Sequence, residues 1–233
     1  MSKFDWAKIP ELFIQIIPAI TITIEYVVIA FFLGSLFGGL LAWAKLGRNR
    51  VLKALANGYT TVMRCVPAIV LLFVVYYGLP RILPLNPTGK IKFVAITLSL
   101  FTAGSMSETF RSSYQAVDRS QFEAAKSIGM TGVQELWYII FPQMIRTAIP
   151  NICNSLLALI KEGSLAFTIG LYDLLGQGNY IIGKNLGAYV LETYVTLVII
   201  YWPISAIITG ISGKLEKKLD FTSREKGRRK AHA

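Results

Sequence analysis

A few ionisable and hydroxyl side chains lie inside or beside long apolar segments of the chain. The carboxylates are Glu108 and Glu162, the cations are Arg64 and Lys161, and Ser164 adds a hydroxyl. Charged groups at membrane depth are costly, and they generally face a cavity or a partner. One interpretation is a structural ion pair between Lys161 and Glu108. The other is a polar pocket for a zwitterion, with the carboxylates attracting its ammonium group and a cation attracting its carboxylate.

The segments that carry these residues have the length and composition of membrane-spanning helices. The 233 residues are 54% hydrophobic and 16% charged, with a mean hydropathy of +0.53. An apolar run of about twenty residues is long enough to cross a bilayer as a helix. The sequence therefore predicts an all-α integral membrane protein with a single transmembrane domain over 1–233. Its five predicted transmembrane helices are roughly 19–44, 57–79, 93–113, 149–171 and 189–211.

Glycine and proline refine two of these spans. Gly34, Gly38 and Gly39 give the first span a small-residue face, on which another helix can pack closely. The fourth span is expected to begin near Ile149, with Pro150 in its first turn, where a missing N–H does no harm.

Catalytic and metal chemistry finds little support in the sequence. The lone His232 allows neither a His–Cys metal cluster nor a His-based triad, so we expect no catalytic residue, no metal site and no cofactor in this chain. The segment 178–184 fits most of a Walker A pattern, but Asn185 follows it and offers no hydroxyl for magnesium. We interpret this segment as a glycine-rich turn on the outer side, and the chain should not hydrolyse ATP by itself.

The net charge of +11 is unevenly distributed. Basic residues gather in the connector 45–64, in the loop 118–148 and in the tail 212–233, which five spans place on one side of the membrane. Because cytoplasmic loops carry the excess of Lys and Arg, the N-terminus is expected outside and the C-terminus in the cytoplasm. A membrane-anchored nucleic-acid binder would be another use for the tail, but aromatic interleaving and a recognition motif are both missing.

The loop 118–148 carries a spaced polar motif. Glu123-Ala124-Ala125 is followed after three residues by Gly129, and then after nine by Ile139-x-Phe141-Pro142. This pattern resembles the cytoplasmic EAA loop of permease subunits in bacterial ATP-binding cassette importers, although Phe141 stands where leucine is usual.

Further segments resemble the polar amino acid branch of that family. They are Tyr59–Pro67, Tyr77–Pro80, Glu108–Arg111 and Lys161–Leu165. Two residues depart from its pattern: Cys65 replaces a glycine, and Gly163 replaces a threonine.

The resemblance implies a type I ABC importer permease fold in the bacterial cytoplasmic membrane, surrounded by lipid. It implies import of polar amino acids, and cystine or a charged amino acid suits a pocket of mixed charge. The implied partners are a dimer of separate ABC ATPase subunits that hold ATP and magnesium, a second permease, identical or homologous, and an extracytoplasmic substrate-binding protein. The alternative is an ion-coupled secondary transporter, against which stand the few spans and the lack of an evident inverted repeat.

Residue roles follow from the same resemblance. Glu123 is expected to contact a basic residue of the ATPase, while Ala124, Ala125 and Gly129 permit close approach, and Pro142 completes the motif. Arg64, Glu108, Lys161, Glu162 and Ser164 are the candidate substrate-pathway residues. Since spans three and four flank the loop, its movement could change the separation of the two pathway carboxylates, which are expected to contact the ammonium group.

Overall fold

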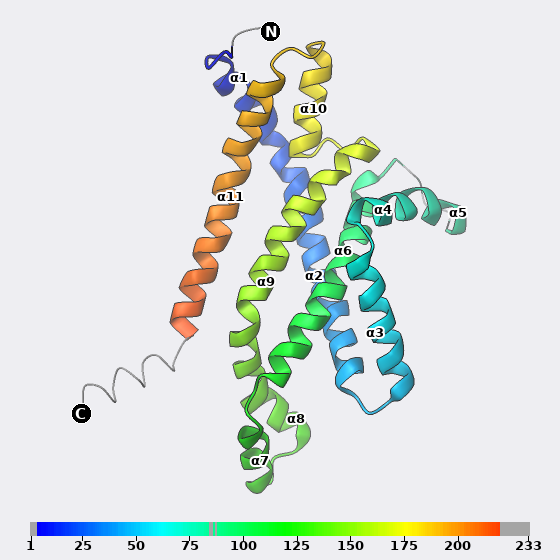
Figure 1. Cartoon of the computed structure of the whole chain (residues 1–233), viewed down its shortest axis with the longest axis vertical. Coiled ribbons are helices and arrows are strands. Elements are labelled where there is room, and N and C mark those ends of the chain that lie inside the picture. The colour runs from blue at the N-terminus through cyan, green and yellow to red at the C-terminus, as the bar shows by residue number, and fades with distance from the viewer. Residues whose placement is uncertain (1–3, 84–85, 87, 220–233) are drawn as a thin grey trace, which may run out of the picture.

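The computed structural model is helical throughout its regular elements in the residues that it describes, which are 4–83, 86 and 88–219. The long helices run side by side along the longest axis of the molecule (Figure 1). The α-helices are α1 (Lys8–Ile16), α2 (Ile20–Leu46), α3 (Arg50–Cys65), α4 (Ala68–Phe73), α5 (Leu79–Ile82), α6 (Lys90–Gln115), α7 (Arg119–Ser127), α8 (Gly132–Gln134), α9 (Phe141–Gly163), α10 (Leu174–Lys184) and α11 (Val190–Leu219). Short 3₁₀ or π segments connect them: η1 (Ile17–Ala19), η2 (Val74–Gly78), η3 (Glu135–Ile140) and η4 (Ser164–Ile169).

Membrane-spanning length is reached by four helical stretches in this described part of the chain. A fifth crossing is obtained if the bent pair formed by α3 and α4–α5 is one span. The all-α membrane fold expected from hydropathy is therefore confirmed.

Helix α6 packs against both α2 and α9 in the bundle (Figure 1). Gly34 and Gly38 let α2 approach it closely, because a Cβ at either position would lie 2.6 Å from Thr102 Cβ or 2.5 Å from Met106 Cβ. Gly39 belongs to a different face of α2, since a Cβ there would meet no atom of the described residues within 4 Å. The small-residue face predicted for this span thus consists of Gly34 and Gly38.

The predicted span 57–79 is not one straight helix. Its first half lies in α3, and the chain then turns by 106° at Val66 and Pro67 before α4 begins. Val66 adopts an extended conformation, with φ −81° and ψ 129°. The physical reason is that a residue before proline avoids the helical region.

The helix that contains the predicted fourth span starts earlier than Ile149. Helical structure runs from Gly132 through η3 and α9, and Pro150 lies inside α9, not in a first turn. The helix irregularity falls further upstream, at Pro142. Segments η2 and η3 are both π-turns that end two residues before a proline, Pro80 and Pro142 respectively. A wider turn accommodates the missing N–H there, so the predicted boundary at Pro150 is wrong.

The segment 178–184 lies within α10 and is helical, so the predicted glycine-rich turn is also wrong. Asp173 begins this helix by accepting a hydrogen bond from the Gly176 backbone N–H at 2.8 Å, which favours helix over turn. The predicted tail 212–233 starts inside α11, and its residues 220–233 lie outside the described part of the chain.

The two ends of the bundle carry different elements. Helices α7 and α8 lie at one end, whereas α1 and α10 lie at the other (Figure 1). The segment that contains α7, α8 and η3 directly joins α6 to α9.

Candidate functional site

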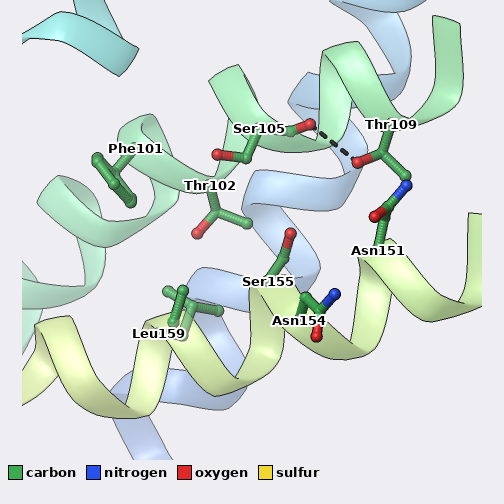
Figure 2. Close-up of a pocket in the computed structure, with 9 residues that line it drawn as sticks. Phe101, Thr102, Ser105, Thr109, Asn151, Asn154, Ser155 and Leu159 are labelled. Carbon is green, nitrogen blue, oxygen red and sulfur yellow. Dashed lines mark hydrogen bonds between the residues drawn. The ribbon is translucent and has the colours of Figure 1, made fainter. Parts of the chain in front are cut away.

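A cavity of about 230 Å³ lies between α6 and α9 and is lined by polar side chains together with Phe101, Ala158 and Leu159. Helix α6 contributes Ser105 and Thr109, and α9 contributes Asn151, Asn154 and Ser155, which point toward them (Figure 2). These residues recur every three or four positions and so share one face of each helix. Polar groups on facing helices within an apolar bundle form a surface on which a polar molecule can exchange hydrogen bonds.

The amides of this cavity are not used by the protein itself. Asn151 and Asn154 have no side-chain hydrogen bond to any residue in the described ranges, whereas the Thr109 hydroxyl donates to the Ser105 carbonyl oxygen at 3.1 Å. An amide offers both donors and acceptors. The cavity can therefore bind either end of a zwitterion.

A second cavity, of about 350 Å³, continues the first toward the α7 end of the bundle. It shares Ser105, Thr109 and Asn151 with the first cavity and adds Arg64, Glu108 and Ser112. The sequence prediction placed Arg64 and Glu108 in a common pathway, and the structure brings both to this second cavity.

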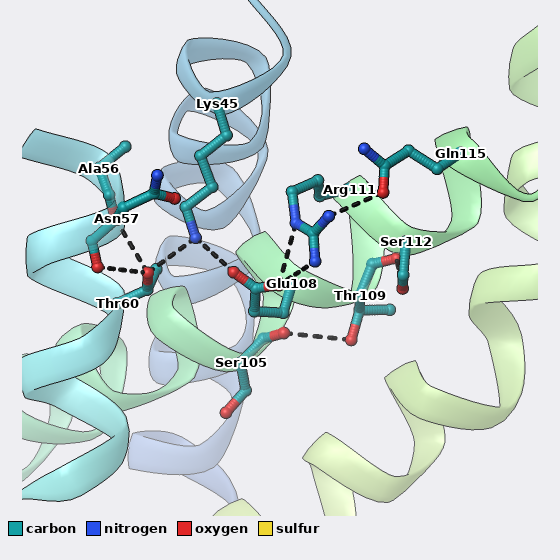
Figure 3. Close-up of polar contacts among 10 residues, drawn as sticks. All are labelled: Lys45, Ala56, Asn57, Thr60, Ser105, Glu108, Thr109, Arg111, Ser112 and Gln115. Carbon is teal, nitrogen blue, oxygen red and sulfur yellow. Dashed lines mark hydrogen bonds and ion pairs between the residues drawn. The ribbon is translucent and has the colours of Figure 1, made fainter. Parts of the chain in front are cut away.

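Glu108 is held by two cations from the protein (Figure 3). Its Oε1 accepts a hydrogen bond from Lys45 Nζ at 2.6 Å, and its Oε2 accepts from Arg111 Nη2 at 2.7 Å. Lys45 Nζ also donates to Thr60 Oγ1 at 2.7 Å. The predicted pairing of Glu108 with Lys161 is therefore wrong, because Lys45, which lies 63 positions away in the sequence, reaches the carboxylate from α2.

Arg64 lies in the last turn of α3, beside a glycine of α6. A Cβ at Gly104 would lie 3.8 Å from Arg64 Cγ, which is ordinary van der Waals contact and places the arginine stem against α6. Within the described part of the chain the guanidinium has neither a hydrogen-bond nor an ion-pair partner. Its donors are free for a molecule in the second cavity.

The remaining candidates lie at the other end of α9. Glu162 follows Ala158, which lines the first cavity, by about one helical turn, and so continues the same face of the helix. Lys161 is rotated from that face by roughly 100° and is exposed. The Ser164 hydroxyl donates to the Lys161 carbonyl oxygen at 2.6 Å, which commits it to the backbone. Of these three residues, Glu162 is the one placed to extend the polar face.

Gly163 has a structural explanation. A Cβ at this position would overlap the ring of Tyr26, whose hydroxyl donates to Asp173 Oδ2 at 3.1 Å. The tyrosine ring therefore occupies the volume in which the side chain of a threonine at position 163 would lie.

The predicted coupling motif lies at the α7 end of the bundle. Asp118 caps α7 by accepting a hydrogen bond from the Ser120 backbone N–H at 2.8 Å, and this bond holds the pKa of the Asp118 carboxyl below its usual value. Glu123 and Ala124 are exposed on α7, as a docking role requires. Pro142 is exposed at the start of α9.

Two small residues of the motif have roles inside the chain. Ala125 is buried, with 3% of its surface exposed, so its small side chain serves packing of the loop. Gly129 has φ +78°, and the Met130 N–H donates to the Ala125 carbonyl oxygen at 3.1 Å, which ends α7 in the manner of a Schellman motif. A left-handed residue at this point strongly favours glycine.

Sequence reasoning missed Lys45 and the uncharged lining of the cavities. Asn151, Asn154 and Ser155 could have been found from their spacing, since they fall on one face of a predicted span. Lys45 carried no such signal, because it belongs to the basic connector 45–64, whose positive charge was already explained by its expected place on the cytoplasmic side.

The described residues contain no group of three or more His, Cys, Asp or Glu side chains that could hold a metal ion.

Comparison with known proteins gives consistent matches along nearly the whole chain. The family model described as "binding-protein-dependent transport system inner membrane component" matches residues 34–221. The Bacillus subtilis protein named "probable amino-acid permease protein YxeN" is 36% identical over 222 residues, covering 94% of this chain and 97% of that protein. The "L-cystine transport system permease protein TcyL" of the same organism is 30% identical over 223 residues, covering 94% and 92%.

Solved structures agree with these matches. One described as "crystal structure of an amino acid ABC transporter with histidines" superposes with a TM-score of 0.84 at 26% identity, covering 93% of this chain and 100% of the other. An inward-facing structure of the MetNI methionine ABC transporter gives a TM-score of 0.72 at 15% identity, covering 88% and 96%, and shows a shared fold.

Proposed function

The chain belongs to the family of binding-protein-dependent transport system inner membrane components, and from that membership we propose that it is the permease subunit of an ATP-driven importer of polar amino acids. The relatives named for amino acid transport support this function. The observation that carries the proposal is the polar face between α6 and α9. The loop that joins these two helices is the one that bears the Glu123 motif.

This connection suggests how energy reaches the substrate. A partner that moves α7 and α8 pulls on the ends of both helices that line the cavities. The two walls then change their separation, and the polar cavity opens toward one side of the membrane or the other. In this mechanism the permease contributes the passage and the segment α7–α8 that moves its walls. ATP hydrolysis takes place on a separate ATPase subunit that holds ATP and magnesium.

The proposed orientation follows from charge and from the arrangement of the helices. Arg48 and Arg50 lie where α2 turns into α3, and Arg119 and Lys126 lie on α7. These basic residues at the α7 end of the bundle favour the cytoplasmic side for that end. The N-terminus and α10 then face outward, in a bacterial cytoplasmic membrane. An external binding protein would deliver the amino acid to that side, and a second permease, identical or homologous, would complete the channel.

Each pathway residue has a proposed part. Arg64 binds the substrate carboxylate, Glu162 attracts the ammonium group near the outer end of α9, and the Asn151 and Asn154 amides bind the molecule between them. Glu108 holds Lys45 and Arg111 and so shapes the inner cavity. L-Cystine, which names one relative, is a substrate that fits a passage with carboxylate and amide partners along its length.

The test replaces an amide in the passage by an apolar group of similar size. Asn151→Leu removes the donor and acceptor shared by both cavities, and uptake into vesicles that contain the permease, its ATPase and its binding protein should fall roughly tenfold, since a lost hydrogen bond to a charged group is worth about 1.5–3 kcal/mol. Asn185→Leu at the exposed end of α10 is the matched control and should leave uptake unchanged. Full uptake by the Asn151→Leu variant would contradict the proposed passage.

A further inference from the structure

The inner cavity, defined as the second cavity above, is more positively charged than its lining first suggests. Arg64 and Glu108 are the charged residues that line it. Behind Glu108, however, stand Lys45 and Arg111, each bonded to one oxygen of the carboxylate. Two cations thus hold the single carboxylate, as Figure 3 shows for Lys45, Glu108 and Arg111, and Arg64 adds a third positive charge to the cavity lining.

Glu108 is not free to bind a substrate ammonium group. The Lys45 side chain has 0% of its surface exposed, and Glu108 is the carboxylate that it contacts. Removing a counter-ion from a buried charge is strongly unfavourable, so Glu108 has to stay with Lys45. Its second oxygen is occupied by Arg111 through both Nε, at 3.0 Å, and Nη2, at 2.7 Å.

Arg64 is the group in this cavity that remains available. No side chain in the described ranges bonds to its guanidinium, and Arg64 lines the inner cavity. A guanidinium binds carboxylates in a planar, two-point geometry and cannot lose its charge at physiological pH. The free cation therefore prefers a carboxylate and repels an ammonium or guanidinium side chain.

We infer that the inner cavity selects amino acids by the charge of the side chain, binding a carboxylate at Arg64 and disfavouring cationic substrates. This inference rests on the proposed import function and narrows its substrate class to amino acids with neutral or acidic side chains. The amide and hydroxyl lining does not reverse the preference, because Asn151, Ser105 and Ser112 accept and donate equally well.

Glu162 does not supply the missing negative charge in the inner cavity. It lies about three turns beyond Asn151 on α9, which is roughly 16 Å along the helix axis. Its attraction acts at the outer end of the passage, on the ammonium group that every amino acid carries. Discrimination by side-chain charge is therefore assigned to Arg64.

The experiment measures binding to the permease itself, so that the binding protein cannot impose its own selectivity. The full permease–ATPase complex is placed in lipid nanodiscs, and binding of radiolabelled L-glutamate, L-glutamine and L-lysine is measured without the binding protein. We expect glutamate and glutamine to bind at least about tenfold more tightly than lysine, and Arg64→Gln to remove most of that difference by relieving the repulsion of the lysine side chain, because the α-carboxylate is common to all three.

Two further variants separate charge from folding. Arg64→Lys keeps the positive charge and should keep the preference, even where the two-point geometry is lost. Lys53→Gln removes an exposed cation from the same helix and should change nothing. Thermal unfolding of each complex checks that the variants are folded.

Two results would overturn the inference. Lysine could bind as tightly as glutamate, or Arg64→Gln could leave the preference intact. Uptake after addition of the binding protein and ATP distinguishes the two proposals. ATP-driven uptake that favours lysine contradicts the charge selection alone, whereas the absence of any ATP-driven amino acid uptake contradicts the importer function as well.

Discussion

Lys45 Nζ lies 2.6 Å from Glu108 Oε1, and this contact ties α2 to α6 through a lysine side chain that is wholly buried. The lysine also donates to Thr60 on α3, so one ammonium group connects three helices (Figure 3). A buried charge of this kind depends on its partner. Its importance for the fold exceeds what a surface ion pair would contribute.

Loss of the carboxylate should therefore destabilise the protein more than loss of the whole pair. Glu108→Leu leaves the Lys45 ammonium buried without a counter-ion and should lower the free energy of unfolding by about 3 kcal/mol. The double variant Lys45→Met with Glu108→Leu removes both charges and should recover most of the loss. Thermal unfolding of the purified permease measures both. Equal stabilities for the single and double variants would mean that the pair is not coupled.

Gly129 should be needed for its backbone conformation. Its φ of +78° disfavours any side chain, so Gly129→Ala should weaken the end of α7 by about 1–2 kcal/mol. Hydrogen exchange at the α7 amides should become faster. Gly132→Ala, at a position without positive φ and with no described atom near a new Cβ, should leave exchange unchanged. Unaltered hydrogen exchange in both variants would mean that the left-handed conformation of Gly129 does not stabilise the C-terminal end of α7.

Glu123 should transmit the contact with the ATPase. Glu123→Ala removes an exposed charge from α7 and should lower substrate-stimulated ATP hydrolysis roughly tenfold, as expected for one charged hydrogen bond across an interface. Insertion into the membrane should be normal. Glu11→Ala, an exposed glutamate at the opposite end of the bundle, is the matched control and should have no effect. Wild-type hydrolysis by the Glu123 variant would remove this glutamate from the coupling mechanism.

Glu162 and Lys161 should behave differently although they are neighbours in the chain. Glu162→Gln alters the polar face of α9 and should reduce transport by about tenfold, within the range for a charged hydrogen bond, while the affinity of the binding protein for amino acids stays the same. Lys161→Gln changes an exposed residue off that face and should transport normally. Equal transport by both variants would mean that Glu162 does not take part in substrate passage and has a structural role only.

Hydropathy and charge predicted the membrane class and the existence of the spans because both depend on local composition. The bend at Val66 and Pro67 was harder to predict, because a proline alone does not show whether a helix will break. Pro150, for example, lies inside α9 without ending it. A proline breaks a span or sits inside it depending on how neighbouring turns adjust. In this chain the adjustment is a π-turn before Pro142, which sequence periodicity does not reveal.

The candidate site was predicted in part for a related reason. Arg64 and Glu108 stood out because charges in apolar spans are rare, and they do line one cavity. The partner of Glu108 could not be read from the sequence, because Lys45 comes from a distant helix and looked like a topology signal. Asn151 and Asn154 were overlooked because uncharged amides are less conspicuous than charges, although their spacing on α9 was available.

The most direct measurement of the central proposal is uptake by purified components in sealed vesicles. We predict that the permease co-purifies with a separate ATPase and that radiolabelled L-glutamine or L-cystine accumulates only when the binding protein and ATP are both supplied. Vesicles that contain the permease alone should accumulate nothing under an imposed proton or sodium gradient. Robust gradient-driven accumulation by the permease alone, without ATPase or binding protein, would contradict the account.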